Sequence, residues 1–294
     1  MTTNRITPIV RRAMTGGAVC GLAVAGLAAG TAGAASSEPP TSDAATAAAA
    51  DEIQFPIAYE VGQTAVQTGR FTTEMSGSML GGESFTVDFE MAMTSEVIEV
   101  DEDGSGVLQI TFDSTEVLEA PDGADLSTLD DLVGVSYTQE FDADGEMGDV
   151  ELADEDSLTD DQRDAFEEFG DQAQAATVTF PEVAVAVGDT WSEETEIESE
   201  GIEIPMTLDY ELVALDAETY TLEMTASSEF SDEIQGTDVD GDVLATGTVV
   251  GRRDNPLAMS VTQNQAITMH ADGEGSLELV IDLTLEADGL PLPA

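Results

Sequence analysis

The chain has 294 residues, with 62 aspartates and glutamates against seven arginines, no lysine and a formal net charge of −55. The negative electrostatic field of such a chain repels phosphate backbones and anionic lipid surfaces, which excludes nucleic acids and anionic membranes as partners. A hydrophobic content of 41% still supplies enough apolar side chains for a folded core.

Residues 1–34 have the features of a secretory signal peptide. Arg5, Arg11 and Arg12 precede a stretch rich in glycine, alanine and valine, and Ala32-Gly33-Ala34 forms a cleavage site. We therefore expect cleavage before Ala35 and an extracellular protein, and association with the cell wall stays open. The apolar stretch is too short for a transmembrane anchor, and the rest of the chain contains no uninterrupted apolar run. We therefore expect no membrane insertion of the mature chain.

Two other interpretations of this region fit less well. The Arg11-Arg12 pair is typical of twin-arginine export, but the residues after it are not hydrophobic enough. Cys20 could be a lipidated cysteine, but Gly-Ala-Val precedes it instead of a lipobox. If Cys20 leaves with the signal, no disulfide is available, and the fold depends on core burial alone.

The remaining chain divides into four segments by composition. Residues 35–52 are rich in alanine, serine, threonine and proline, which predicts a disordered linker. Residues 53–152 and 177–294 are predicted to be two β repeats, and residues 153–176 a helical connector.

Apolar and polar residues alternate with a period of two along most of both β segments, which indicates antiparallel strands with one wet face. The clearest series are Phe85 to Met93, Leu108 to Phe112, Ile202 to Leu212, Tyr220 to Met224 and Leu277 to Leu285.

Turn chemistry separates these runs and predicts hairpins in series. Asp-Gly occurs in VDEDGSG, FDADGEMG, TDVDGD and HADGEG, and RRDNPLA at 252–258 is a further reverse turn. One helix is predicted over residues 157–175, where Thr159 and Gln162 form a capping-box pattern. A shorter helix is predicted at residues 125–132.

A repeated pattern links the two β segments. FPIAYEVGQT at 55–64 and FPEVAVAVGDT at 180–190 share Phe-Pro, then Val-Gly, an amide or acid, and threonine. TVDFEM at 86–91 and TLDYEL at 207–212 follow at similar spacing. We therefore predict a mainly β fold with antiparallel meander sheets, built from two repeats that share a core as a half-barrel or sandwich, with one or two short connecting helices.

The Phe-Pro…Val-Gly-Asp-Thr-Trp segment after an acidic helix resembles a family of secreted bacterial proteins and lipoproteins of unknown function. The resemblance covers most of residues 55–290 and implies no activity. This chain departs from the lipoprotein members because it lacks a good lipobox.

Catalytic signatures are weak, so we expect that the protein is not an enzyme and has no cofactor. His270 is the only histidine, and no Gly-x-Ser-x-Gly elbow accompanies it. Paired carboxylates would suit a hydrolase, the weakest alternative, but 62 acids produce such pairs by chance and few aromatic residues could line a sugar cleft.

Calcium is the inorganic alternative, in a structural or surface-associated module. Two clusters of carboxylate oxygens suit this ion, namely Asp101 with Asp103, and Asp238 with Asp240 and Asp242. Neither cluster matches an EF-hand loop, and hairpin turns alone account for both.

An apolar ligand held between the repeats is the leading hypothesis, and another secreted protein is the alternative partner. Methionines at apolar positions of the predicted strands suit promiscuous apolar binding, although core filling explains them as well. The predicted lining residues are Met91, Met93, Met206, Met224, Met259 and Trp191.

Overall fold

The computed structural model describes the two β segments and part of the chain between them. The described residues are 29–31, 52–55, 57–122, 124, 126–143, 147–163, 165–166, 178–181, 183–199, 202–234, 237–271, 273 and 275–293. The predicted signal peptide and linker therefore lie outside the described residues, except for Ala29–Thr31 and Glu52. The predicted domain boundaries stay predictions.

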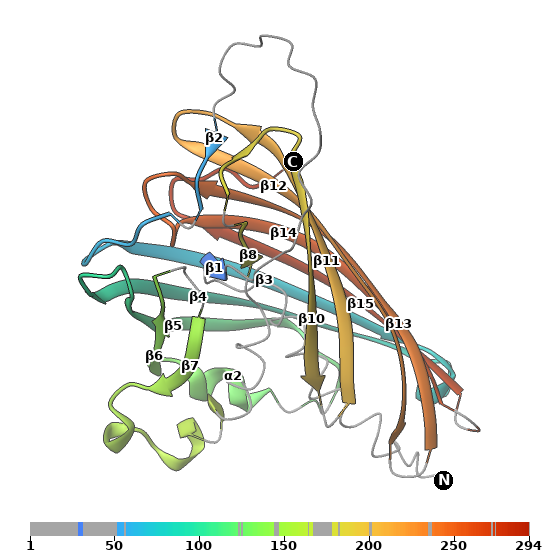
Figure 1. Cartoon of the computed structure of the whole chain (residues 1–294). Coiled ribbons are helices and arrows are strands. Elements are labelled where there is room, and N and C mark those ends of the chain that lie inside the picture. Colours follow the sequence, from blue (N-terminus) through green and yellow to red (C-terminus); the bar gives the residue numbers. More distant parts are fainter. Residues whose placement is uncertain are drawn as a thin grey trace, which may run out of the picture.

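One antiparallel sheet of eleven strands forms the molecule (Figure 1). In spatial order, its first six strands come from residues 190–287 and its last five from residues 64–152. That order is β10 (Thr190–Ser199), β11 (Ile202–Leu215), β12 (Thr219–Ile234), β13 (Thr237–Arg252), β14 (Met259–Ala271), β15 (Gly275–Ala287), β3 (Thr64–Ser76), β4 (Ser84–Val100), β5 (Gly106–Glu119), β6 (Ser136–Phe141) and β7 (Met147–Leu152).

The two halves of the sheet join where the last strand pairs with the first long one. β15 runs antiparallel to β3, with residues 278–287 opposite residues 67–76. β10 and β7 form the two ends of the strand order, so the sheet does not close. The predicted fold class, a mainly β meander of antiparallel strands, is confirmed.

Smaller elements flank the sheet. Two short strand pairs form, one parallel between β1 (Ala29–Thr31) and β8 (Val178–Thr179), and one antiparallel between β2 (Glu52–Ile53) and β9 (Val185–Ala186). The short helix predicted at 125–132 is α2 (Ser127–Leu132), and η1 (Ser78–Leu80) and η2 (Glu155–Ser157) are single 3-10 turns.

The predicted longer helix begins as expected. Residues 160–163, 165 and 166 are helical, and most of the rest of the predicted helix lies outside the described residues. The Thr159 hydroxyl accepts a bond from the Gln162 N–H at 3.2 Å, and the Gln162 Oε1 accepts one from the Thr159 N–H at 3.1 Å. This reciprocal pair is the predicted capping box.

One predicted turn is wrong. TDVDGD at 237–242 belongs to β13, whereas VDEDGSG and HADGEG do connect strands. Gly241 is needed there for packing, because a Cβ at this position would lie 2.5 Å from Cζ of Phe230. Asp-Gly at this point therefore marks a close approach of an aromatic ring to a strand instead of a reverse turn.

The repeated Val-Gly segments make the same turn twice. Gly62 has φ +86° and Gly188 has φ +94°, a left-handed conformation that glycine adopts without strain. The Gly62 N–H donates to the Val97 carbonyl at 2.8 Å, and the Gly188 N–H donates to the Leu212 carbonyl at 2.7 Å.

The residue after each glycine closes its turn with a side-chain oxygen. Gln63 Oε1 accepts from the Glu60 N–H, and Asp189 Oδ2 accepts from the Ala186 N–H, both at 2.8 Å. This shared bond explains why an amide in one copy corresponds to an acid in the other, since each supplies one carbonyl-type oxygen.

The two Phe-Pro segments meet in an aromatic cluster of Phe55, Phe180 and Tyr220. The Phe55 and Phe180 rings stack at a centroid distance of 4.2 Å, and Tyr220 meets Phe55 edge-on at 5.1 Å. The Tyr220 hydroxyl lies 3.7 Å from the Met259 sulfur. All three aromatic side chains are buried, so this cluster joins the two halves of the chain beyond the β15–β3 pairing.

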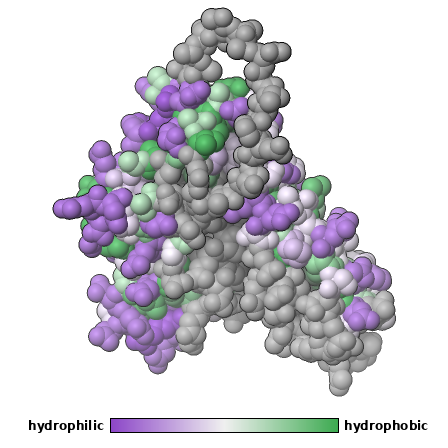
Figure 2. Space-filling view, viewed as in Figure 1, coloured by the Kyte–Doolittle hydropathy of each residue, from purple (hydrophilic) through white to green (hydrophobic). Residues whose placement is uncertain are grey.

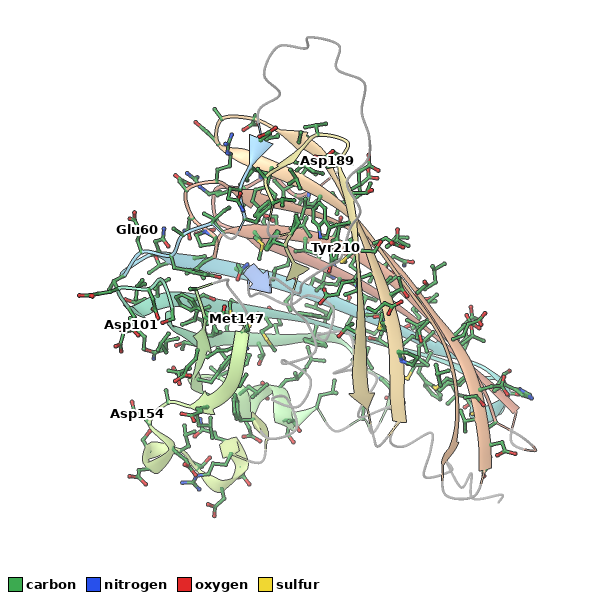
Figure 3. All side chains as sticks on the ribbon, in the orientation of Figure 1. Glu60, Asp101, Met147, Asp154, Asp189 and Tyr210 are labelled. Atoms are coloured by element: carbon green, nitrogen blue, oxygen red, sulfur yellow. The ribbon has the colours of Figure 1, made fainter. Side chains whose placement is uncertain are left out.

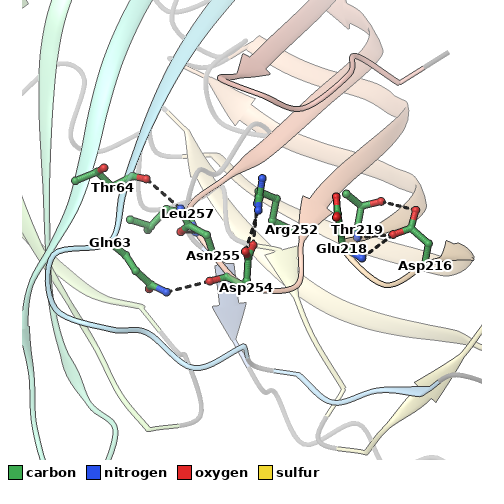
Figure 4. Close-up of polar contacts among 9 residues, drawn as sticks. All are labelled: Gln63, Thr64, Asp216, Glu218, Thr219, Arg252, Asp254, Asn255 and Leu257. Atoms are coloured by element: carbon green, nitrogen blue, oxygen red, sulfur yellow. Dashed lines mark hydrogen bonds and ion pairs between the residues drawn. The ribbon is translucent and has the colours of Figure 1, made fainter.

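Polar contacts between loops support the same end of the molecule (Figure 4). Gln63 Nε2 donates to the Asp254 carbonyl at 3.1 Å, and Asn255 Nδ2 donates to the Thr64 carbonyl at 3.0 Å. Asp216 accepts backbone bonds from Thr219 and Glu218, which lower the pKa of its carboxyl group.

An ion pair on the outer side of the sheet joins a buried aspartate to an exposed arginine: the Asp88 side chain is 10% exposed and that of Arg70 is 55% exposed. The Asp88 carboxylate accepts two bonds from Arg70, at 2.6 and 3.0 Å, and one from the Thr72 hydroxyl at 3.3 Å. The bond from Arg70 is the main reason that the pKa of Asp88 lies below its usual value.

Arg70→Met is expected to destabilise the protein more at pH 7 than in acid. Because the folded-state pKa of Asp88 is lowered, its stabilising effect is complete above about pH 4 and is lost as the pH falls through the lowered value. Urea unfolding at several pH values measures the difference. Arg252→Met, which removes the pair with the more exposed Asp254, should change little at either pH. An equal loss for Arg70→Met at all pH values would contradict this linkage.

Candidate functional site

The two faces of the sheet differ sharply in chemistry. Along β3 and β15 the side chains alternate between buried and exposed, and the buried set is mostly apolar. We call the face that carries the buried set the inner face and the opposite one the outer face. Hydrophilic residues cover much of the described surface (Figure 2), and the acids Glu60, Asp101 and Asp154 lie at the periphery (Figure 3).

All five predicted methionines lie on the inner face and are buried. Met91 and Met93 lie on β4, Met206 on β11, Met224 on β12 and Met259 at the start of β14. β13, β14, β15 and β3 separate Met224 from the pair on β4. The methionines therefore share one face, but the structure does not gather them into one pocket.

Trp191 occupies the same face near one end of the sheet. It lies on β10 directly opposite Tyr210 of β11, and the two rings stack with centroids 5.4 Å apart. Tyr210 is in turn opposite Met224 of β12. Trp191, Tyr210 and Met224 thus form a row across three strands, which brings two of the predicted lining residues close to each other.

Several polar side chains interrupt the apolar inner face, and sequence reasoning missed them. The buried polar residues on this face are Gln67, Thr73, Ser95, Gln139, Ser228, Gln263 and Gln265. Gln67 Nε2 donates to the Met259 carbonyl and Gln139 Nε2 to the Gly148 carbonyl, both at 3.1 Å. A signal for two of them was present, since Gln263 and Gln265 occupy apolar positions in the alternation of β14.

The predicted calcium ligands lie in two separate places. Asp238, Asp240 and Asp242 are exposed at alternate positions of β13, on its outer face. Asp103 closes the β4–β5 turn by accepting bonds from Ser105, which lowers the pKa of its carboxyl group. Among the residues that the structure describes, no three His, Cys, Asp or Glu side chains converge as metal ligands would.

An open hollow of about 470 Å³ crosses β12, β13, β14 and β15. Three consecutive residues of each strand line it. Eight of the lining residues belong to the outer face, namely Glu223, Thr225, Thr246, Thr248, Thr262, Asn264, Asp282 and Thr284, and four lie between them at inner-face positions, namely Met224, Gly247, Gln263 and Leu283. Of the predicted lining residues only Met224 contributes to it, so this polar hollow is distinct from the predicted apolar site.

Shifted pKa values in the described chain have structural causes. Four carboxyl groups have a lowered pKa, and each accepts hydrogen bonds in an ion pair or a turn; they belong to Asp88, Asp103, Asp216 and Asp254. Burial raises the pKa of the Tyr137 and Tyr220 hydroxyl groups. A general acid needs a raised carboxyl pKa, which is the opposite of the shift in these four groups.

No helix in the described part of the chain is both long and apolar enough to cross a bilayer.

The chain is thus a mainly β protein with an open antiparallel sheet, one face of which is buried and largely apolar. Residues 86–276 match the model of DUF6263, a family of unknown function, and the chain belongs to that family. The match includes the second Phe-Pro segment but not the first. No curated protein matches the chain.

Two solved structures show low similarity to this chain. One is described as "Lipid-protein interactions in lipovitellin", with a TM-score of 0.45 and 10% identity over 80% of this chain and 26% of that chain. This chain thus spans about a quarter of the lipovitellin chain. The other is an AttH protein from Nitrosomonas europaea, with a TM-score of 0.19 and 10% identity over 82% of this chain and 99% of that one. Neither similarity carries an argument about function.

Proposed function

We propose that this protein is a secreted, non-catalytic binding protein that holds an apolar ligand against the inner face of its sheet. Secretion is inferred from the signal-like sequence of residues 1–34. A calcium-stabilised structural or surface-associated module is the alternative, but the separation of Asp101 and Asp103 from the β13 acids gives it less support.

One observation carries the proposal: a largely apolar inner face belongs to a sheet that does not close. In a small closed barrel, side chains from opposite strands fill the interior and pack against one another. Here β10 and β7 end the strand order without pairing to each other. Thioether and aromatic side chains extend along this face from Trp191 to Met93, and such side chains adapt to apolar ligands of different shapes.

The uncharged fluorophore N-phenyl-1-naphthylamine tests the proposal directly. Its emission rises in apolar surroundings, and excitation of Trp191, the only tryptophan, should give energy transfer to bound probe. The protein would be purified from the culture medium of a secreting host, and its presence there would test the signal prediction. Saturable emission with transfer from Trp191 is the expected result. No saturable emission would overturn the proposal.

Two substitutions identify the face that binds the probe. Met224→Gln preserves side-chain length but places an amide on the inner face, and we expect about three- to tenfold weaker probe binding. Thr262→Lys fills the outer hollow and should leave probe binding unchanged. Thermal melting of both variants checks that each is folded. The reverse pattern would place the ligand in the outer hollow and contradict the proposal.

A further inference from the structure

Gln263 and Gln265 form a polar pair in the middle of the apolar inner face. They occupy successive inner positions of β14, and each side chain is only 6% exposed. Within the described part of the chain, the Oε1 atom of each is buried and has no hydrogen-bond partner. Ser228 on β12 is likewise buried with a hydroxyl oxygen that has no partner there.

Small residues lie beside this glutamine pair. Gln263 is opposite Gly247 of β13, and Gln265 is opposite Ala245 of the same strand. Ala245 is in turn opposite Ala226 of β12. Short side chains therefore flank the two amides on β12 and β13, and the Met224 methyl group lies 2.9 Å from where a Cβ of Gly247 would lie.

An unpaired amide in such a place is costly for the protein alone. A buried carbonyl oxygen that loses its water partners and gains no donor destabilises the folded state. Leucine or methionine would fill the same positions without that cost, as Leu279, Ile281 and Leu283 do on neighbouring β15. A ligand that brings a hydrogen-bonding group to the pair would remove the cost when it binds.

The charges of the chain restrict what that group can be. A carboxylate has no proton to donate to an amide oxygen, and the net charge of −55 repels anions. The described arginines are engaged elsewhere: Arg70 with Asp88, Arg163 with Asp160, Arg252 with Asp254, and Arg253 with the Asp216 carbonyl. A hydroxyl group both donates and accepts, so it fits a glutamine amide in either orientation.

We propose that the ligand is an uncharged amphiphile whose hydroxyl group donates to the amide oxygen of one of Gln263 and Gln265 and accepts from the amide N–H of the other, while its hydrocarbon part lies along the inner face. This inference rests on the proposed function and names its ligand class. It distinguishes neutral lipids that carry a hydroxyl group from fatty acids and other anionic lipids.

Displacement of N-phenyl-1-naphthylamine by three compounds that share a twelve-carbon chain tests the inference at pH 8. 1-Dodecanol carries a hydroxyl group, 1-methoxydodecane accepts but cannot donate, and dodecanoate is anionic. We expect 1-dodecanol to displace the probe at about tenfold lower concentration than either of the others, as one or two net hydrogen bonds imply.

The Q263M/Q265M variant separates the glutamines from the rest of the face. Because methionine matches glutamine in length and removes two amides from the inner face, the variant should bind the apolar probe more tightly than the wild type but lose the preference for 1-dodecanol. Q139M is the matched control: it removes another buried glutamine on the same face and should keep the preference.

The outcomes distinguish the two proposals. If the wild-type protein does not bind the probe, the proposed function fails and this inference fails with it. If the probe binds but the three compounds compete equally, or dodecanoate competes best, only the ligand class is overturned. A preference for 1-dodecanol that persists in Q263M/Q265M would also overturn the assigned role of the two glutamines.

Discussion

Phe180→Ala is expected to lower the free energy of unfolding by about 3–5 kcal/mol. The side chain is 2% exposed and packs near Phe55, at a centroid distance of 4.2 Å, and Tyr220, at 6.4 Å. Its removal leaves a cavity where the two Phe-Pro segments meet. Urea unfolding followed by circular dichroism would give the difference.

The partner ring and an exposed neighbour complete this experiment. Phe55→Ala should cost a similar amount, and the double substitution should cost less than the two losses together, by a coupling of about 0.5–1.5 kcal/mol. Val183→Ala changes an exposed side chain three residues from Phe180 and should stay within about 0.5 kcal/mol of wild type. A loss below about 1 kcal/mol for Phe180→Ala, which is typical of a surface position, would show that this cluster does not hold the chain together.

Gly251→Ala is expected to cost about 2–3 kcal/mol, although alanine usually suits a strand better than glycine. A Cβ at this position would lie 2.2 Å from Cζ and 2.3 Å from the hydroxyl oxygen of Tyr220. The buried tyrosine ring must therefore move, and its edge contact with Phe55 moves with it. Thermal and urea unfolding would both show the loss.

A matched glycine separates this overlap from general effects of alanine. Gly148 lies on β7, where a Cβ would make an ordinary 3.5 Å contact with Glu140, so Gly148→Ala should be close to neutral. Tyr220→Leu in the Gly251→Ala background should cost less than it does in the wild type, because the overlapping ring is already displaced. Equal losses at the two glycines would contradict the overlap as the cause.

Periodicity predicted the faces of the strands but could not predict all of their neighbours. The alternation in β4, β11 and β15 follows directly from which side chains need burial, and the repeated Val-Gly turns need a left-handed residue. The local sequence pattern carries no information about the pairing of β15 with β3, because the two strands lie about two hundred residues apart in the sequence. The Asp-Gly pair in TDVDGD led to a wrong turn prediction. Gly241 is required there because the Phe230 ring packs against it, and the chain does not reverse at this point.

The candidate site was predictable in composition but not in position. Met91 and Met224 were expected on apolar faces and lie there, yet only the strand order shows how far apart they are. Gln263 and Gln265 are visible in the sequence as polar residues at apolar positions. Their lack of partners depends on what packs against them, which a single sequence does not give.

The two ends of the strand order also bear on self-association. Among the described strands, β10 and β7 each have a neighbour on one side only, so their free backbone groups could pair with the edge of another molecule. The β10 sequence TWSEETEIES contains four glutamates, and β7 adds Asp149 and Glu151. Edge-to-edge pairing would bring these like charges together. The acidity of these two edges therefore opposes the joining of copies of the chain into longer sheets.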